Sequence, residues 1–288
     1  MSTFVVTGSA SGMGKASAER LREAGHVVIG VDLKDADVVA DLSTPAGRSA
    51  AVAQVLERSG GALDGAVLAA GLGPHPGREK LIAQVNYFGV VELLNGWRDA
   101  LATSGDARVV VFSSNSSTTV PLVPEKTIRA FLDGDAEAAI AATKRFKDNA
   151  SAMVYAGSKI AVTRWLRRNA VLPEWIGSGI RLNAVAPGAI LTPMVEAQLA
   201  DPHQRGAIEA FPMPVGRHGK AEEVAEAVMF LLGPASGFMV GTVLFVDGGT
   251  DAYFRSDDWP KQVPFSGLRR YIRLGRAYAA AKGVKANF

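Results

Sequence analysis

The sequence predicts an α/β fold built on a doubly wound parallel sheet. Six short apolar runs rich in β-branched residues alternate with longer helix-like stretches along the chain, a pattern typical of βα units. Within the runs, polar and apolar residues do not alternate, which indicates strands buried on both faces by helices. The runs lie at residues 4–7, 27–31, 66–69, 109–112, 180–185 and 243–246.

Composition limits the class of protein. The 288 residues are 48% hydrophobic and 20% charged, as in globular α/β proteins. There is no cysteine, and the four histidines lack the spacing of metal ligands, so we expect no disulfide and no metal site. No apolar run reaches the length of about 18 residues that a membrane span needs, and the first residues show no leader pattern, so we expect a cytoplasmic protein.

Charge separates the chain into two parts. We expect a single domain over residues 1–251 and a basic extension over residues 252–288. The extension holds eight Lys or Arg and two Asp, a net charge of +6, which leaves −3 for the rest of the chain. A mildly acidic domain argues against a nucleic-acid partner.

The sequence of the extension predicts an amphipathic helix. We favour packing of this helix on this chain or on a partner subunit, with membrane contact or disorder as the alternatives.

The first strand leads into a glycine-rich turn and a helix-like stretch, "TGSASGMGKASAERLREAG". Gly8, Gly12 and Gly14 allow a tight turn and let backbone amides and a helix N-terminus approach a pyrophosphate. Ser11 and Met13 lie between them and belong to the same predicted site. Because a strand precedes the turn, a helix follows it and an acidic residue ends the next strand, the turn predicts a Rossmann-type dinucleotide site.

That acidic residue is Asp32, which ends "VVIGVD" and is followed by Leu33. A carboxylate at this position accepts hydrogen bonds from ribose hydroxyls and repels the extra phosphate of NADP. The sequence therefore favours NAD as the cofactor, although nearby Lys34 leaves some use of NADP open.

Two residue pairs further along extend the predicted cofactor site. Asp41 and Leu42 stand where an adenine could be bound, and Ala70 and Gly71 close the third apolar run, where small residues allow a ribose to pass. Taken alone, each pair is also typical of an ordinary loop. Their order after the glycine-rich turn favours the functional interpretation.

Four polar residues predict a proton-transfer site. Asn86 lies in a predicted helix and Ser114 follows the fourth apolar run, at the edge where open α/β sheets bind ligands. Tyr155 and Lys159 are four residues apart, hence on one face of a helix. A free tyrosine titrates near pH 10, so we expect the nearby cation to lower the pKa of Tyr155 and make it a general acid or base. Taken alone, a Tyr and a Lys four residues apart are also common on the exposed face of helices, where they have no catalytic role.

Together these motifs resemble the short-chain dehydrogenase/reductase family. "TGSASGMG" is similar to its TGxxxGxG motif, "AAG" to a degenerate NNAG, "FSS" to its serine motif, "YAGSK" to its YxxxK motif and "IRLNAVAPGAILTPM" to its last-strand PG loop. The motifs occur in the family's order and cover residues 3–250. The pattern is most similar to the bacterial 3α-hydroxysteroid dehydrogenase/carbonyl reductase group.

The resemblance implies a role for each motif residue. Tyr155 would be the proton donor and acceptor, and Lys159 would bind the nicotinamide ribose and lower the pKa of Tyr155. Ser114 would hydrogen-bond the substrate oxygen, and Asn86 would order a water relay. Residues that would line the nicotinamide pocket are Pro187, Gly188, Ile190 and Thr192.

One interval departs from the family pattern. Ser114 and Tyr155 are 41 residues apart, whereas the family has a much shorter interval, so we expect a helical insertion at about residues 118–150. It should lie near the helices of Asn86 and Tyr155, which most family members use in a four-helix dimer interface. We therefore expect a homodimer through residues 222–232 and the final strand, with a homotetramer as the alternative.

The resemblance implies an NAD(H)-dependent enzyme that interconverts a secondary alcohol and a ketone without a metal. A hydrophobic, steroid-like substrate would suit the apolar residues of a predicted lid over residues 191–215, although these residues could equally only pack the lid against the sheet. They are Leu191, Met194, Val195, Leu199, Phe211 and Met213. The alternatives are another small alcohol (a terpenol, sugar or acyl alcohol) as substrate, and a non-catalytic NAD-binding scaffold protein.

Overall fold

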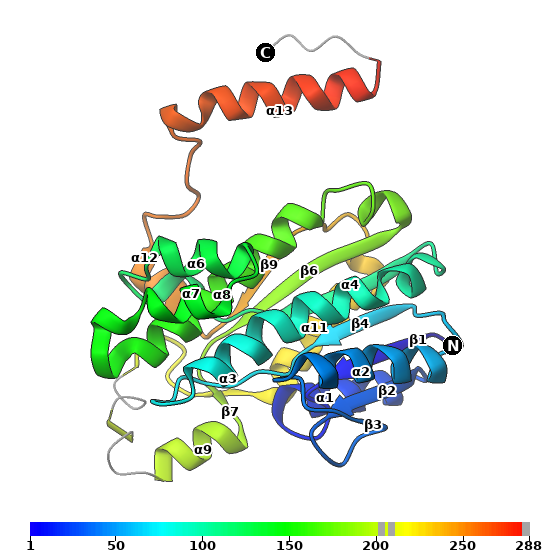
Figure 1. Ribbon diagram of the computed structural model, residues 1–288, viewed down its shortest axis with the longest axis horizontal. Helices are drawn as coiled ribbons and strands as arrows, with labels where there is room; N and C mark the ends of the chain where they lie inside the picture. The colour runs from blue at the N-terminus through cyan, green and yellow to red at the C-terminus, as the bar shows by residue number, and fades with distance from the viewer. Residues whose placement is uncertain (201–204, 207–210, 284–288) are drawn as a thin grey trace. The chain divides into compact units, whose positions relative to one another are not determined.

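The computed structural model describes residues 1–200, 205–206 and 211–283, and it confirms the predicted fold class (Figure 1). Seven parallel strands form one sheet in the order β3-β2-β1-β4-β5-β6-β9. Along the chain they are β1 Thr3–Thr7, β2 Val27–Asp32, β3 Val38–Val39, β4 Gly65–Leu68, β5 Ala107–Phe112, β6 Ile180–Pro187 and β9 Val243–Val246. A separate pair joins β7 Ile190–Leu191 and β8 Gly219–Lys220. The sequence analysis did not predict β3, because a strand of two residues is too short to show a pattern of apolar residues.

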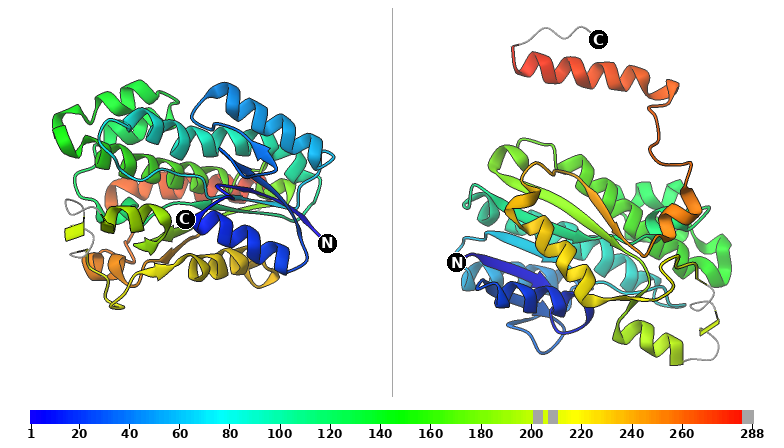
Figure 2. Two further views of the ribbon diagram at one scale, coloured as in Figure 1. Left: turned by 90° about the horizontal axis from the view of Figure 1, so that it is seen from below. Right: turned by 180° about the vertical axis from the view of Figure 1, so that it is seen from behind.

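Helices cover both faces of the sheet. α1 Gly12–Glu23 and α11 Ala221–Leu232 lie side by side on one face, the blue and yellow helices in the right-hand view of Figure 2. The opposite face is covered by α2 Pro45–Arg58, α4 Gly89–Ala102 and α8 Ala150–Asn169. Each face has its own apolar core, because successive strand residues point to opposite sides. In β1, for example, Val5 belongs to one core, and Phe4 and Val6 belong to the other.

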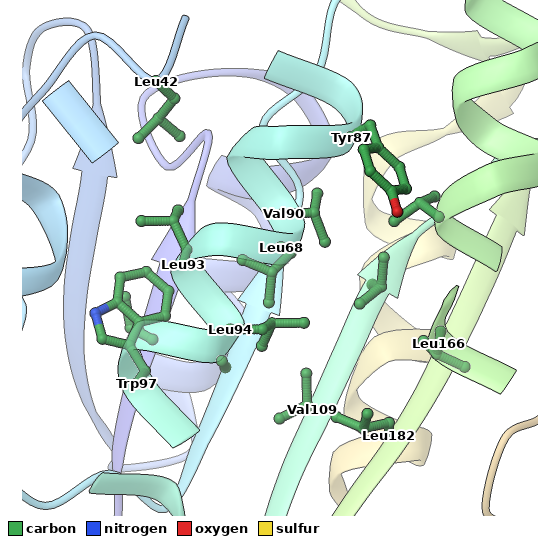
Figure 3. Packing of buried hydrophobic residues seen from close by; sticks show 14 of the residues in the cluster. Leu42, Leu68, Tyr87, Val90, Leu93, Leu94, Trp97, Val109, Leu166 and Leu182 are labelled. Atoms are coloured by element: carbon green, nitrogen blue, oxygen red, sulfur yellow. The ribbon is translucent and has the colours of Figure 1, made fainter. Parts of the chain in front are cut away.

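The larger core shows how the helices hold the sheet. Leu93, Leu94 and Trp97 of α4 are fully buried in the same core as the strand residues Leu68 and Val109, and Leu94 lies beside Leu68 (Figure 3). Leu93 and Leu94 precede Trp97 by four and three residues, spacings that place each of them on the same side of the helix as Trp97. This packing fixes the strands whose carboxyl ends carry the predicted site.

The expected helical insertion lies between β5 and α8. Its elements are α5 Ser116–Thr119, α6 Glu125–Leu132, α7 Ala136–Ala141 and η2 Lys144–Asn149. Phe131 of α6 is fully buried, and its ring centroid lies 5.3 Å from that of Tyr87. Thr127 packs so closely on α8 that a Cβ added at Gly157 would meet its Cγ2 at 2.7 Å. The insertion is therefore part of the packed body.

The remaining described elements are short, apart from one helix in the extension. They are α3 Glu79–Ala83, η1 Gln84–Phe88, η3 Ile176–Ser178, α9 Pro193–Ala200, η4 Pro234–Ser236, α12 Thr250–Arg255, η5 Phe265–Gly267 and α13 Leu268–Ala281. The chain divides into two compact units, Met1–Tyr253 and Phe254–Phe288. α13 confirms the predicted basic helix of the extension. No helix in the described ranges is long and apolar enough to cross a membrane.

Candidate active site

A cleft of about 640 Å³ opens at the carboxyl ends of the strands, where open parallel sheets bind ligands. All the predicted cofactor contacts line it: Gly8, Ser11, Gly12, Met13, Gly14, Asp32, Leu33, Asp41, Leu42, Ala70, Gly71, Tyr155, Lys159, Pro187, Gly188, Ile190 and Thr192. Ser114 lines it too, whereas Asn86 does not. Segments far apart in the sequence thus meet around one space.

The glycine-rich turn leaves no room for side chains at two of its positions. Gly8 has a φ of +70°, and a Cβ there would lie 2.9 Å from the Ala70 amide nitrogen. A Cβ at Gly14 would lie 2.2 Å from the Gly8 carbonyl oxygen. Ser11, the N-cap of α1, makes no side-chain cap bond to the described residues, and the first turn of α1 lacks acidic residues. The amides at this helix N-terminus therefore suit an anion such as a pyrophosphate.

Asp32 is tied to the glycine-rich turn. Its two carboxylate oxygens accept hydrogen bonds from the backbone N–H groups of Ala10, at 2.9 Å, and Leu33, at 2.7 Å. Each ionised oxygen can accept more than one hydrogen bond. Asp32 can thus hold the turn and still accept hydrogen bonds from a ligand in the cleft.

The two serines that follow β5 have different surroundings. The Ser113 hydroxyl pairs with that of Thr163 at 2.6 Å, toward α8. The Ser114 Oγ accepts the backbone N–H of Ser116 at 3.1 Å, and the Ser114 hydroxyl lies close enough to Tyr155 to act on the pKa of its phenol. This difference agrees with the choice of Ser114 over Ser113 as the substrate-binding serine.

Lys159 and Tyr155 lie in a desolvated part of the cleft. Lys159 is 5% exposed, and its Nζ donates to the Phe112 carbonyl oxygen at 2.8 Å. Burial lowers the pKa of Lys159 to about 8, because a low-dielectric site disfavours the charged form. Burial likewise raises the pKa of Tyr155, an effect that the nearby Ser114 and Ser116 hydroxyls oppose.

The predicted lowering of the Tyr155 pKa is therefore wrong for this structure. Desolvation has the largest effect on the phenol, and Lys159 is not among the groups that shift its pKa. The ammonium is bonded to a backbone carbonyl of β5. Ser116 is also a group that the sequence prediction missed, since no motif marks the second residue after Ser114.

Asn86 organises the loop that follows β4. It is fully buried in the π-helical segment η1, a rare geometry that often marks functional sites. Its side-chain amide accepts from the Leu72 N–H at 2.8 Å and donates to the Leu72 carbonyl at 2.9 Å. A Cβ added at Gly71 would lie 3.4 Å from the Asn86 Oδ1 and 3.6 Å from the Lys159 Nζ. Asn86 thus lies next to the cleft and supports its wall.

The loop after β6 closes the end of the cleft next to Tyr155. The Pro187 carbonyl accepts the N–H of Asn115 at 2.9 Å, which ties this loop to the residues after Ser114. A Cβ at Gly188 would lie 2.7 Å from the Asp247 Cα, so this close approach requires glycine. Beyond it, the Thr192 Cγ2 lies 3.5 Å from the Cβ position of Gly12.

The predicted lid is described only in part. Val195 of α9 lines the cleft. The side chain of Met194 and residues 201–204 and 207–210 lie outside the described residues. Arg78, Leu81 and Val85 also line the cleft but carry no motif that could have identified them. Within the described residues, no group of His, Cys, Asp and Glu could hold a metal ion.

Similar proteins identify the family. The sequence model described as enoyl-(acyl carrier protein) reductase matches residues 137–251. The 3-alpha-hydroxysteroid dehydrogenase/carbonyl reductase of Comamonas testosteroni is 38% identical over 255 residues, which cover 88% of this chain and 98% of the relative. The chain belongs to the short-chain dehydrogenase/reductase family.

Two further relatives in the short-chain dehydrogenase/reductase family have names that state a reaction. The cis-4-hydroxycyclohexanecarboxylate dehydrogenase of Sinomonas cyclohexanicum is 34% identical over 86% of this chain and 96% of the relative. The crystal structure of the 3-alpha-hydroxysteroid dehydrogenase from Pseudomonas sp. B-0831 in complex with NADH is 47% identical, with a TM-score of 0.83 over 90% of this chain and all of that one. All three named relatives act on hydroxyl or carbonyl groups.

Proposed function

We propose that this protein is an NAD(H)-dependent oxidoreductase that interconverts a secondary alcohol and a ketone on a hydrophobic, steroid-like substrate. One observation carries the proposal: Ser114, Tyr155 and Lys159 share a single cleft with the glycine-rich turn and Asp32. The names of the relatives support the reaction and the substrate class.

The residues of the cleft fit a dinucleotide. The pyrophosphate would lie against the amides of the turn, where Gly8 and Gly14 leave no room for a Cβ, and the adenosine ribose would bind Asp32. When bound, NAD supplies hydride chemistry at C4 of its nicotinamide. The acidic Asp32 favours NAD over NADP.

Proton transfer falls to side chains of this chain. In the direction of ketone reduction, the Tyr155 O–H gives its proton to the substrate oxygen; in alcohol oxidation, the Tyr155 oxygen takes the alcohol proton. The Ser114 O–H donates to the same substrate oxygen and holds it near Tyr155. The Lys159 ammonium, which the Phe112 carbonyl oxygen holds in the cleft, would donate to the nicotinamide ribose.

A substrate panel tests the proposal. Steroids, terpenols, sugars, acyl alcohols and hydroxycyclohexanecarboxylates are each supplied with NAD and with NADP, and formation of the reduced nicotinamide is followed by absorbance. We expect NAD-dependent oxidation, with kcat/KM highest for a cyclic hydrophobic alcohol. If NADH binds but no member of the panel reacts, the chain is a cofactor-binding scaffold and the proposal fails.

Asp32→Ala should relax the cofactor preference. Removing the carboxylate removes both the ribose acceptor and the repulsion of a 2′-phosphate, so we expect kcat/KM for NAD to fall and that for NADP to rise, each by about tenfold. Steady-state kinetics with both cofactors measure the ratio. Because Asp32 also accepts the Ala10 N–H, Asp32→Asn serves as the control that keeps an acceptor. An unchanged ratio in both variants would refute the assignment.

We further propose a homodimer formed through α11 and the sheet edge at β9. The insertion covers the alternative face, since Phe131 packs on Tyr87 and Thr127 packs on α8. Large apolar side chains remain exposed at the other end: Phe230 of α11 is 43% exposed and Phe238, just before β9, is fully exposed. Exposed apolar groups of this kind mark interfaces.

Phe238→Asp should convert the dimer into a monomer, because it places a charge in the proposed interface. Light scattering measures the mass. Leu122→Asp is the matched control, since Leu122 is 80% exposed on the insertion and should leave the dimer intact. A tetramer for the natural protein, or a dimer that only Leu122→Asp disrupts, would contradict this arrangement.

For the basic extension we propose packing on the catalytic domain or on a partner subunit, and for the protein a cytoplasmic location. In α13 four arginines fall mostly on the opposite face of the helix from Leu268, Tyr271, Ile272 and Tyr278. The net charge of +6 on the extension opposes that of −3 on the rest of the chain. Light scattering of a chain that lacks residues 256–288, together with liposome sedimentation of the full chain, separates this arrangement from membrane contact.

A further inference from the structure

Arg48 is a buried arginine whose guanidinium donates four hydrogen bonds. It lies in the first turn of α2 and is 3% exposed. Its Nε and Nη2 donate to the two carboxylate oxygens of Glu92 in α4, at 2.6 and 3.0 Å. Its Nη1 donates to the Gln84 Oε1 and to the Leu42 carbonyl oxygen, each at 3.0 Å. One guanidinium therefore joins α4 and η1 to the segment that precedes α2.

That segment, residues 41–43, forms the wall of the cleft beside Asp32. The Leu42 side chain is 6% exposed, next to the start of α4 (Figure 3), where a Cβ at Gly89 would lie 3.6 Å from the Leu42 Cβ. Arg48 holds the same residue by its carbonyl. Leu42 is thus fixed from its side chain and from its backbone.

The ion pair between Arg48 and Glu92 is better explained as a means of positioning the groups that Arg48 bonds than as a contribution to the stability of the fold. Arg48 is buried but the Glu92 side chain is 43% exposed, and a partly exposed ion pair adds little to the free energy of unfolding. The planar fork of arginine, in contrast, fixes the direction of each group that it bonds. The segment needs such support, because β3, which precedes it, pairs with the sheet over only two residues.

We propose that Arg48 is a positioning residue for dinucleotide binding: it holds residues 41–43 in place at the adenosine end of the cleft. The inference rests on the proposed function and deepens it. A wall that is already ordered lowers the entropy cost of binding. Arg48 touches neither the cleft surface nor Tyr155, so its effect should appear in cofactor affinity and leave proton transfer unchanged.

The test compares Arg48→Met and Arg48→Lys with the natural protein. Met removes all four hydrogen bonds, and we expect the Kd for NADH and the KM for NAD to rise about tenfold while kcat stays within about twofold. Lys keeps the charge without the fork, so we expect an intermediate value. Reduced nicotinamide mononucleotide, which lacks the adenosine, should react with equal kinetics in all three proteins.

Arg181→Met is the matched control. Arg181 is 6% exposed and bonds Asp106 and the Ser236 carbonyl, at the opposite end of the sheet from the cleft. It should lower the melting temperature without changing the Kd for NADH. Equal increases of Kd in Arg48→Met and Arg181→Met, or an unchanged Kd in Arg48→Met, would overturn the inference. Absence of NADH binding by the natural protein would instead overturn the proposed function itself.

Discussion

Tyr155→Phe is expected to lower kcat by a factor of about 10² to 10⁴, the range for loss of a general acid or base. The substitution removes the O–H that exchanges a proton with the substrate oxygen and keeps the ring. NADH binding should change little, because the dinucleotide turn and Asp32 are untouched. Stopped-flow and steady-state assays of alcohol oxidation and ketone reduction measure the effect in both directions.

Tyr87→Phe provides the matched control for Tyr155→Phe. Tyr87 is 3% exposed, packs against Phe131 and does not line the cleft. Burial raises the pKa of Tyr87 to about 12, so its hydroxyl stays neutral at ordinary pH. Activity should survive the loss of this hydroxyl. If Tyr155→Phe retained the activity of Tyr87→Phe, another group would have to transfer the proton.

Lys159→Met is expected to abolish most activity and to change how stability depends on pH. The pKa of Lys159 is about 8 in the folded protein and about 10.4 in an unfolded chain. Between these values the unfolded state binds a proton that the folded state does not. The free energy of unfolding of the natural protein should therefore rise with pH through this window, by up to about 3 kcal/mol from Lys159 alone.

Urea unfolding at pH 7 to 10 measures this dependence. The Lys159→Met variant lacks the titrating group, so its stability relative to that of the natural protein should be greatest near pH 7 and decline toward pH 10. Lys144→Met, which replaces an exposed lysine of η2, should give the same pH profile as the natural protein. Parallel profiles for all three proteins would show that the buried ammonium is not destabilising.

Local motifs made most of the cleft predictable from the sequence. The glycine-rich turn and Asp32 are recognisable because a strand, a turn and a helix follow one another within a short stretch. The helix period placed Tyr155 and Lys159 on one face, and the long interval after Ser114 indicated the insertion. In each case the information lies in the order and spacing of residues along the chain.

Contacts between distant segments could not be predicted in this way. Asn86 hydrogen-bonds the Leu72 backbone, and Arg48 bonds Glu92. Tertiary packing brings these residues together, and no local pattern in the sequence marks either contact. The direction of the Tyr155 pKa shift was predicted wrongly. The sequence shows Lys159 four residues away, but it does not show that burial of the phenol has the largest effect on this pKa. Ser116 was missed because no motif marks the second residue after Ser114.

The most direct test of the proposed function is the stoichiometry of one reaction. The purified protein is incubated with NAD and a 3α-hydroxysteroid, and the ketone product and NADH are quantified by mass spectrometry and absorbance. The proposed site predicts one ketone for each NADH with the natural protein and neither product with Tyr155→Phe. NADH binding without ketone formation across the whole alcohol panel, or ketone formation that does not depend on Tyr155, would contradict it.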